Sequence, residues 1–336
     1  LSGPVFSRSV EQDRSESTML VKVEFEVDFR LDQLVEGFWS LESIGIVDED
    51  EGDALRQFLE TTKFNKLSGR YQVSLPWRLG VGMIADNYTQ CYQRLVNQLT
   101  RFRRNPDLFM EYHKVMQEQI DAGVLEPASK DAPGVGACYY LPHHCVVRDD
   151  HNTTKLRVVY DGSSRVVGPS LNQSLHQGPC LIPELVRILL RLRCRKYAVI
   201  GDLEKAFLQI EVAEADRDYL RTLWIKNFEP HCSLTGREKF ELMVLRFTRC
   251  VFGVTSSPFH LLATIIRHTA KYVDRYKSVV DEIRRSMYVD DLVSGADTEA
   301  EAYSLFVTAK NIFKEGGFNL RNFSSNSQAL ECSLQS

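Results

Sequence analysis

Met287-Tyr288-Val289-Asp290-Asp291-Leu292-Val293 places two adjacent aspartates between apolar residues, without the Gly, Asn or Pro of an ordinary turn. Successive side chains of a strand point to opposite faces, so both carboxylates reach one site only where the backbone reverses. We therefore expect a tight hairpin with Asp290 and Asp291 at its tip. Clustered carboxylates repel one another, and a hard divalent cation such as Mg²⁺ offsets that repulsion. The alternative is a solvated Asp-Asp turn, unless a third acid lies upstream in a matching context.

The third acid is Asp202, which follows the apolar segment from Tyr197 to Gly201. Such a run predicts a strand that delivers Asp202 to its end. An aromatic residue, Phe207, follows five positions later. A third segment, between the two acidic ones, leads into a helical pattern: Phe252-Gly253-Val254-Thr255-Ser256-Ser257-Pro258.

Helix and strand patterns alternate along the rest of the chain and predict an α+β fold. Helices are expected over 48–62, 87–102, 105–123, 183–192, 258–266 and 299–313. Strands are expected over 21–27, 69–75, 139–148, 155–161, 244–247 and 318–323, with 139–148 and 155–161 forming a hairpin. Asp86 or Asn87 is the expected cap of the second helix, and residues 163–179 are an expected loop. Asn105, Pro106 and Gly123 bound the third helix.

Composition narrows the function classes only modestly. The 336 residues are 43% hydrophobic and 26% charged, which is ordinary for a globular protein. A net charge of −4 gives no global sign of a nucleic-acid binder, although a local basic face is compatible with it. Eight scattered cysteines without a C-x-x-C pair argue against a zinc ribbon and fit a reducing compartment. No apolar run is long enough to cross a membrane, so we expect no membrane partner.

Three segments in order resemble the catalytic motifs of reverse transcriptases: the strand ending in Asp202, the Phe252-Gly253 segment, and Tyr288-Val289-Asp290-Asp291 as Y-x-D-D. Further segments resemble the BEL/Pao class of LTR retrotransposon Pol polyproteins. They include Tyr140-Leu-Pro-His-His-Cys, Leu156-Arg-Val-Val-Tyr-Asp-Gly-Ser-Ser, Ser170-Leu-Asn-Gln-Ser-Leu-His and Phe318-Asn-Leu-Arg-Asn-Phe.

This resemblance implies the fingers and palm of a right-hand polymerase fold, with an antiparallel palm sheet backed by helices. It implies a linker after a protease-like region over 1–20, and a segment between protease and polymerase over 21–104. Residues 105–336 would be the reverse transcriptase, with the thumb largely missing. Members of the class carry RNase H and integrase further along the polyprotein, so those domains are expected partners.

The resemblance also assigns roles. Asp202, Asp290 and Asp291 would be the catalytic residues and would bind two Mg²⁺ ions, with Mn²⁺ as an alternative. Asp202 and Asp290 match the family's principal ligands. The reaction would be RNA-directed DNA synthesis on a primed RNA or DNA template with dNTPs as substrates.

Nucleotide-binding roles fall on five residues: Lys155, Arg157, Phe207, Phe252 and Gly253. Arg157 and Lys155 would grip the triphosphate, and the competing reading is a solvated hairpin rim. Phe207 would act as a steric gate against ribonucleotides, and its competing reading is a buried core residue. Phe252 and Gly253 would lie beneath the nucleotide, where glycine permits close backbone approach.

One position departs from the family, because Phe323 stands where a Trp is usual near the primer grip. Two alternatives to an active polymerase stay open. The first is a catalytically inactive retroelement fragment that only binds nucleic acid. The second is an unrelated Mg²⁺-dependent phosphoryl-transfer enzyme.

Overall fold

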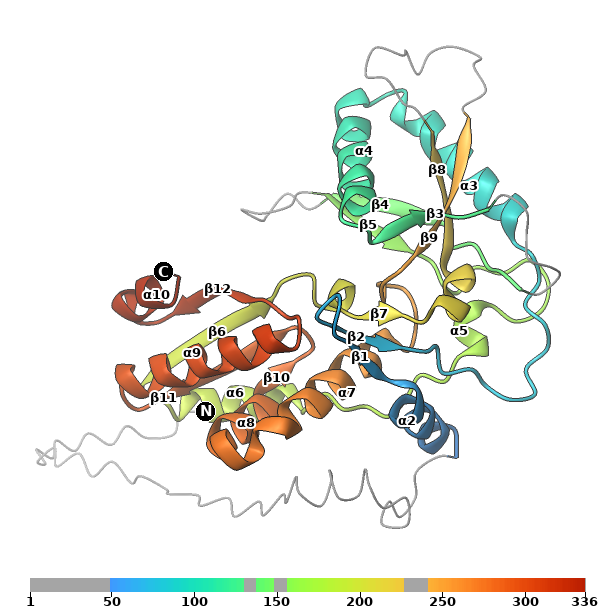
Figure 1. Ribbon diagram of the computed structural model, residues 1–336. Coiled ribbons are helices and arrows are strands. Elements are labelled where there is room, and N and C mark those ends of the chain that lie inside the picture. Colours follow the sequence, from blue (N-terminus) through green and yellow to red (C-terminus); the bar gives the residue numbers. More distant parts are fainter. Residues whose placement is uncertain (1–48, 130–136, 148–155, 227–240, 336) are drawn as a thin grey trace, which may run out of the picture.

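The computed structural model describes residues 49–129, 137–147, 156–226 and 241–335 (Figure 1). Within these residues the chain is a mixed α+β protein with small, mostly antiparallel sheets and nine α-helices. None of the helices described there is long and apolar enough to span a membrane. The expected linker 1–20, the expected strand 21–27 and Lys155 lie outside the described residues.

A four-stranded antiparallel sheet, here called the acidic sheet, has the order β10-β11-β6-β12. Its strands are β6 (Tyr197–Leu203), β10 (Met287–Tyr288), β11 (Asp291–Ala296) and β12 (Leu320–Ser325). Burial alternates along β6, with Val199, Gly201 and Leu203 buried and Asp202 partly exposed. Helix α9 (Glu299–Glu315) packs on the buried face, where the rings of Phe306 and Phe323 meet at 6.0 Å.

Further helices surround this sheet. They are α6 (Leu185–Arg193), α7 (Ser257–Thr269), α8 (Val273–Ser286) and α10 (Gln328–Gln335). The predicted helices around 183–192, 258–266 and 299–313 are therefore present, whereas α8 and α10 were not predicted. Along α6 the expected apolar face is mostly in solvent, because only Ile188 is buried.

A second region, here called the aromatic lobe, contains two smaller antiparallel sheets and two helices (Figure 1). Its strands are β3 (Leu125–Pro127), β8 (Arg221–Ile225) and β9 (Leu242–Phe247), with the hairpin β4 (His143–Val147) and β5 (Leu156–Tyr160). Its helices are α3 (Tyr88–Phe102) and α4 (Pro106–Asp121). All five residues of β8 are buried, and Trp224 lies among the rings of Phe109, Tyr112 and His143.

Helix ends in the lobe partly follow the sequence signals. Asn105 caps α4 through a hydrogen bond from the Leu108 amide, and Gly123 has a φ of 65° just past its end, as expected. Asn87 stands at the cap position of α3 but makes no cap bond. Its side chain instead bonds to the backbone N–H and C=O of Tyr140, because this buried amide is needed to pin the segment before β4.

Shorter elements join the two regions. They are α2 (Glu49–Thr61), β1 (Lys63–Asn65), β2 (Arg70–Val73), α5 (Leu171–Ser174), β7 (Glu211–Val212) and the 3₁₀ turns η1 (Ala206–Gln209), η2 (Glu214–Leu220) and η3 (Ala270–Tyr272). The expected helix 48–62 and strand 69–75 match α2 and β2. The expected loop 163–179 contains the short helix α5, whose Ser170 and Gln173 form a capping box.

Candidate functional site

The three aspartates meet at one end of the acidic sheet. Strand β11 runs antiparallel to β6, and Asp291 is the direct cross-strand partner of Asp202. The Leu203 amide donates a 2.8 Å hydrogen bond to the carbonyl oxygen of Asp290. Directly opposed residues of an antiparallel pair have Cα atoms only about 5 Å apart and side chains on one face. Segments far apart in sequence therefore bring these carboxylates to one place.

The hairpin itself has the predicted form. Tyr288 pairs with Asp291, so Val289 and Asp290 are the two turn residues. Val289 has a φ of 58°, although a β-branched side chain strongly disfavours that region and Gly or Asn usually occupies it. The sheet, and not the turn residue, imposes this backbone conformation.

Backbone strain is concentrated around the carboxylates. Among the described residues, the non-glycine positions with positive φ are Lys205, Val289 and Asn322. Lys205 follows the strand of Asp202, Val289 precedes Asp290, and Asn322 donates a long 3.5 Å hydrogen bond to Asp202 Oδ2. Strained non-glycine residues persist only where the surrounding structure enforces them, and they cluster at functional sites.

Burial, together with electrostatic repulsion among the same carboxylates, raises the pKa of two of them. Burial, reinforced by the charges of Asp290 and Asp202, raises the pKa of Asp291 to about 6. The pKa of Asp202 is also raised, first by burial and then by Asp290, against the opposing effects of Asn322 and Arg321. A divalent cation would relieve this repulsion, and carboxylate oxygens are the donors that Mg²⁺ prefers, so the donor set fits such an ion. Within the described part of the chain, however, no group of three or more His, Cys, Asp or Glu side chains is already arranged to hold a metal ion.

Strand β12 supplies two neighbours that the sequence did not reveal. Arg321 is the cross-strand partner of Asp202 and forms an ion pair of 3.1 Å with Glu204. Asn322 lies at an irregularity in the β12–β6 pairing, which turns its amide toward Asp202. Both belong to the segment 318–323, which was expected as a strand and as part of the family resemblance, without a role for these two residues. Only the pairing of β12 with β6 identifies these two residues as neighbours of Asp202, and no local sequence pattern predicts that pairing.

Two predicted nucleotide-binding aromatics lie against each other. The rings of Phe207 and Phe252 meet edge to face, with centroids 4.3 Å apart. Phe207, in η1, is 2% exposed, whereas Phe252 is 55% exposed. The ring that a bound molecule can touch is therefore that of Phe252, with Phe207 supporting it from below.

At Gly253, the segment that carries Phe252 packs closely against the end of strand β5. Its φ is 97°, and a Cβ atom there would lie 1.9 Å from the carbonyl oxygen of Tyr160. The amide of Asn172 donates to the Gly253 carbonyl at 2.9 Å and accepts from the Thr255 amide at 2.9 Å. Glycine is required here because the backbones approach so closely.

Arg157 lies on β5, three residues before Tyr160, and its side chain is exposed. Figure 1 places the β4–β5 hairpin in the aromatic lobe, apart from β6 and β11. The structure thus groups Asp202, Asp290 and Asp291, pairs Phe207 with Phe252, and ties Gly253 to the strand of Arg157.

No protein-family model matches the chain, and no curated protein matches it. The motifs in the sequence and the geometry of the acidic sheet therefore carry the functional argument.

Proposed function

We propose that this chain is an RNA-directed DNA polymerase, the reverse transcriptase of a BEL/Pao-class retrotransposon polyprotein. The observation that carries the proposal is the pairing of Asp202 with Asp291 across adjacent strands, with Asp290 bonded to Leu203 at the same end. In this proposal the acidic sheet is the palm of a right-hand polymerase and the aromatic lobe is its fingers.

Chemistry would follow from positioning and charge. The primer 3′-hydroxyl oxygen attacks the α-phosphorus of a dNTP, the new O–P bond forms, pyrophosphate leaves, and the hydroxyl proton passes to solvent. Two Mg²⁺ ions held by Asp202, Asp290 and Asp291 would lower the pKa of that hydroxyl and neutralise the leaving pyrophosphate.

The remaining residues bind and orient the nucleotide. Arg157 binds the triphosphate, since a guanidinium contacts phosphate oxygens in a bidentate manner, and Lys155 would assist from the same hairpin. The exposed Phe252 ring contacts the nucleotide, and Gly253 allows the backbone beside it to approach. Phe207 packs against the Phe252 ring from below, and the exposed Phe252 ring would act as the gate against a ribose 2′-hydroxyl.

A second candidate is an inactive retroelement fragment that only binds nucleic acid. Under this alternative the aspartates are a remnant of the catalytic site, and nucleic-acid binding survives without synthesis.

Primer extension separates the two candidates. With an RNA template, a DNA primer, dNTPs and Mg²⁺, the protein should extend the primer, and Asp290→Asn should reduce the rate about 10³-fold. This estimate follows because metal-ion stabilisation is worth several kcal/mol and each 1.4 kcal/mol is a factor of ten. Equal rates for the protein and Asp290→Asn would contradict the polymerase proposal and favour the inactive fragment.

A further inference from the structure

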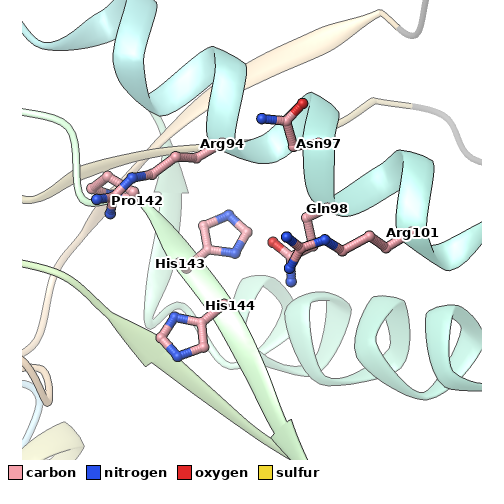
Figure 2. Close-up of a pocket in the computed structure, with 7 residues that line it drawn as sticks. All are labelled: Arg94, Asn97, Gln98, Arg101, Pro142, His143 and His144. Atoms are coloured by element: carbon pink, nitrogen blue, oxygen red, sulfur yellow. The ribbon is translucent and has the colours of Figure 1, made fainter.

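A pocket of about 270 Å³ lies in the aromatic lobe between helix α3 and strand β4, away from the aspartates (Figure 2). One wall comes from α3 and the other from the start of β4. The lining residues are Arg94, Asn97, Gln98, Arg101, Pro142, His143 and His144. The proposed polymerase chemistry does not use this pocket.

The walls of the pocket are basic although the chain as a whole is acidic. Helix α3 contains Arg94 and Arg101 and no aspartate or glutamate, and strands β4 and β5 contain no acid either. Arg103 and Arg104 follow directly after α3. A net charge of −4 for the whole chain makes this a local excess of positive charge.

One carboxylate faces the pocket arginines. Asp161 forms an ion pair of 2.6 Å with Arg94, whose side chain is nevertheless 48% exposed. A guanidinium carries five N–H donors, so a single carboxylate leaves donors of Arg94 open to another acceptor. Arg101 lies on the same face of α3, about two turns further along the helix, and is also exposed.

His143 and His144 have different roles in the pocket. His143 is buried, bonds through Nε2 to the Leu223 carbonyl at 3.0 Å, and contacts the Tyr112 hydroxyl through Nδ1. Both ring nitrogens are therefore engaged with the protein, and His143 acts as a fixed floor. His144 is exposed, so its imidazole is available at the mouth of the pocket.

His144, which lines the pocket, lies on the same face of the β4–β5 hairpin as Arg157. In the β4–β5 register, Arg157 pairs with Val146 and His144 pairs with Val159. Paired residues share a face, and positions two apart on a strand share it too, so His144 and Arg157 are diagonal neighbours about 7 Å apart. Positive or hydrogen-bonding groups thus run from Arg157 through His144 to Arg101 and Arg94.

We propose that this pocket binds a backbone phosphate of single-stranded nucleic acid on its way to the nucleotide site. The assignment rests on the proposed function, because that function supplies the strand. Arginine and amide donors suit a phosphodiester, and contacts of this kind carry affinity without reading sequence.

The test is a binding measurement made without Mg²⁺ or dNTPs. Fluorescence anisotropy of a labelled oligothymidylate is recorded over a range of salt concentrations for the protein and for Arg94→Ala/Arg101→Ala. Each lost phosphate contact should reduce the slope of log affinity against log salt by about 0.7 for a single strand. The double variant should therefore bind more weakly and with a slope smaller by about 1.4.

Matched variants make the result specific. Arg56→Ala removes an exposed arginine that is also ion-paired, to Asp53 on helix α2, and should leave affinity and slope unchanged. Because Mg²⁺ and dNTPs are absent from the measurement, the result does not depend on polymerisation. Far-UV circular dichroism checks that the double variant is folded.

Two outcomes overturn the assignment. The first is an unchanged slope in the double variant. The second is calorimetric binding of inorganic phosphate that the double variant loses while oligothymidylate binding stays intact, which would make this a site for free phosphate. A slope change in a protein that fails to extend primers would support the pocket and refute the polymerase proposal.

Discussion

The acidic sheet and the aromatic lobe differ in what they bury. The lobe surrounds Trp224 with aromatic rings, and every residue of β8 is inaccessible to solvent. Burial in the sheet alternates along β6, with Ile200 and Asp202 on its more open side, and three mutually repelling carboxylates lie at one end of the sheet. Its backbone is strained at Val289 and Asn322 as well. The comparison indicates that the tightly packed aromatic core and the proposed catalytic acids lie in separate parts of the molecule.

The largest effect is expected from truncation in the lobe. Trp224→Ala removes a side chain that is 0% exposed and should lower the free energy of unfolding by about 3–5 kcal/mol. Ile200→Ala, on the open face of the sheet where Ile200 is 40% exposed, should cost less than about 1 kcal/mol. Urea unfolding measures both. Similar losses in the free energy of unfolding for the two variants would contradict the difference in burial between the two regions.

The next largest effect is expected where the segment before α7 meets strand β5 of the aromatic lobe. Gly253→Ala forces a Cβ atom against the Tyr160 carbonyl and strains a residue at φ 97°, so we expect a loss of about 2–3 kcal/mol. Gly80→Ala is the control, because Gly80 also has a positive φ but has open space around its Cα. Thermal unfolding should show a clearly larger loss for Gly253→Ala, and equal losses would refute the close contact.

A pH effect of about 1–2 kcal/mol is expected from His143. Burial lowers the pKa of His143 to about 4, so between pH 6.5 and 4 the unfolded chain binds more protons and acid favours unfolding. The unmodified protein should therefore lose more stability between pH 7 and 5 than His143→Gln does. His144→Gln, at the exposed neighbour, should retain the loss seen in the unmodified protein.

The smallest effect has the opposite sign. The pKa of Asp291 is raised to about 6, so its ionised form opposes folding above that pH and the penalty fades as pH falls toward 4. Asp291→Asn should raise the free energy of unfolding by about 1 kcal/mol at pH 7.5, after allowance for the half-exposed carboxylate. Asp297→Asn, at the exposed residue just after the same strand, should change little. A loss of stability in Asp291→Asn would show that the carboxylates do not oppose folding.

Much of the local structure could be predicted from the sequence. The hairpin at Asp290 and Asp291, the strand ending in Asp202 and the ends of α4 all follow from periodicity, turn and cap signals. These signals act within a few residues. Distant partners of a side chain could not be predicted: Asn87 stands at the cap position of α3, as one of the two expected caps, but its side chain bonds to Tyr140.

The site could be predicted only in part, for the same reason. The sequence identified three acids, but their alignment depends on the register of β11 against β6, which is a long-range property. Arg321 and Asn322 were missed because only the pairing of β12 with β6, which is irregular at Asn322, brings them beside Asp202. The exposure of Phe252 over the buried Phe207 is likewise set by packing.

The left-handed residues near the carboxylates also determine which end of the acidic sheet opens first. Strain lowers the free energy of local opening, and amide protons exchange soonest where that energy is low. The Leu203 amide lies at the strained end. At the other end, the side chain of Asn326 bonds to both the Ala198 amide and the Lys196 carbonyl at 2.9 Å. We therefore expect local opening, and with it amide exchange, to be faster at the Asp202 end of the sheet than at the Ala198 end.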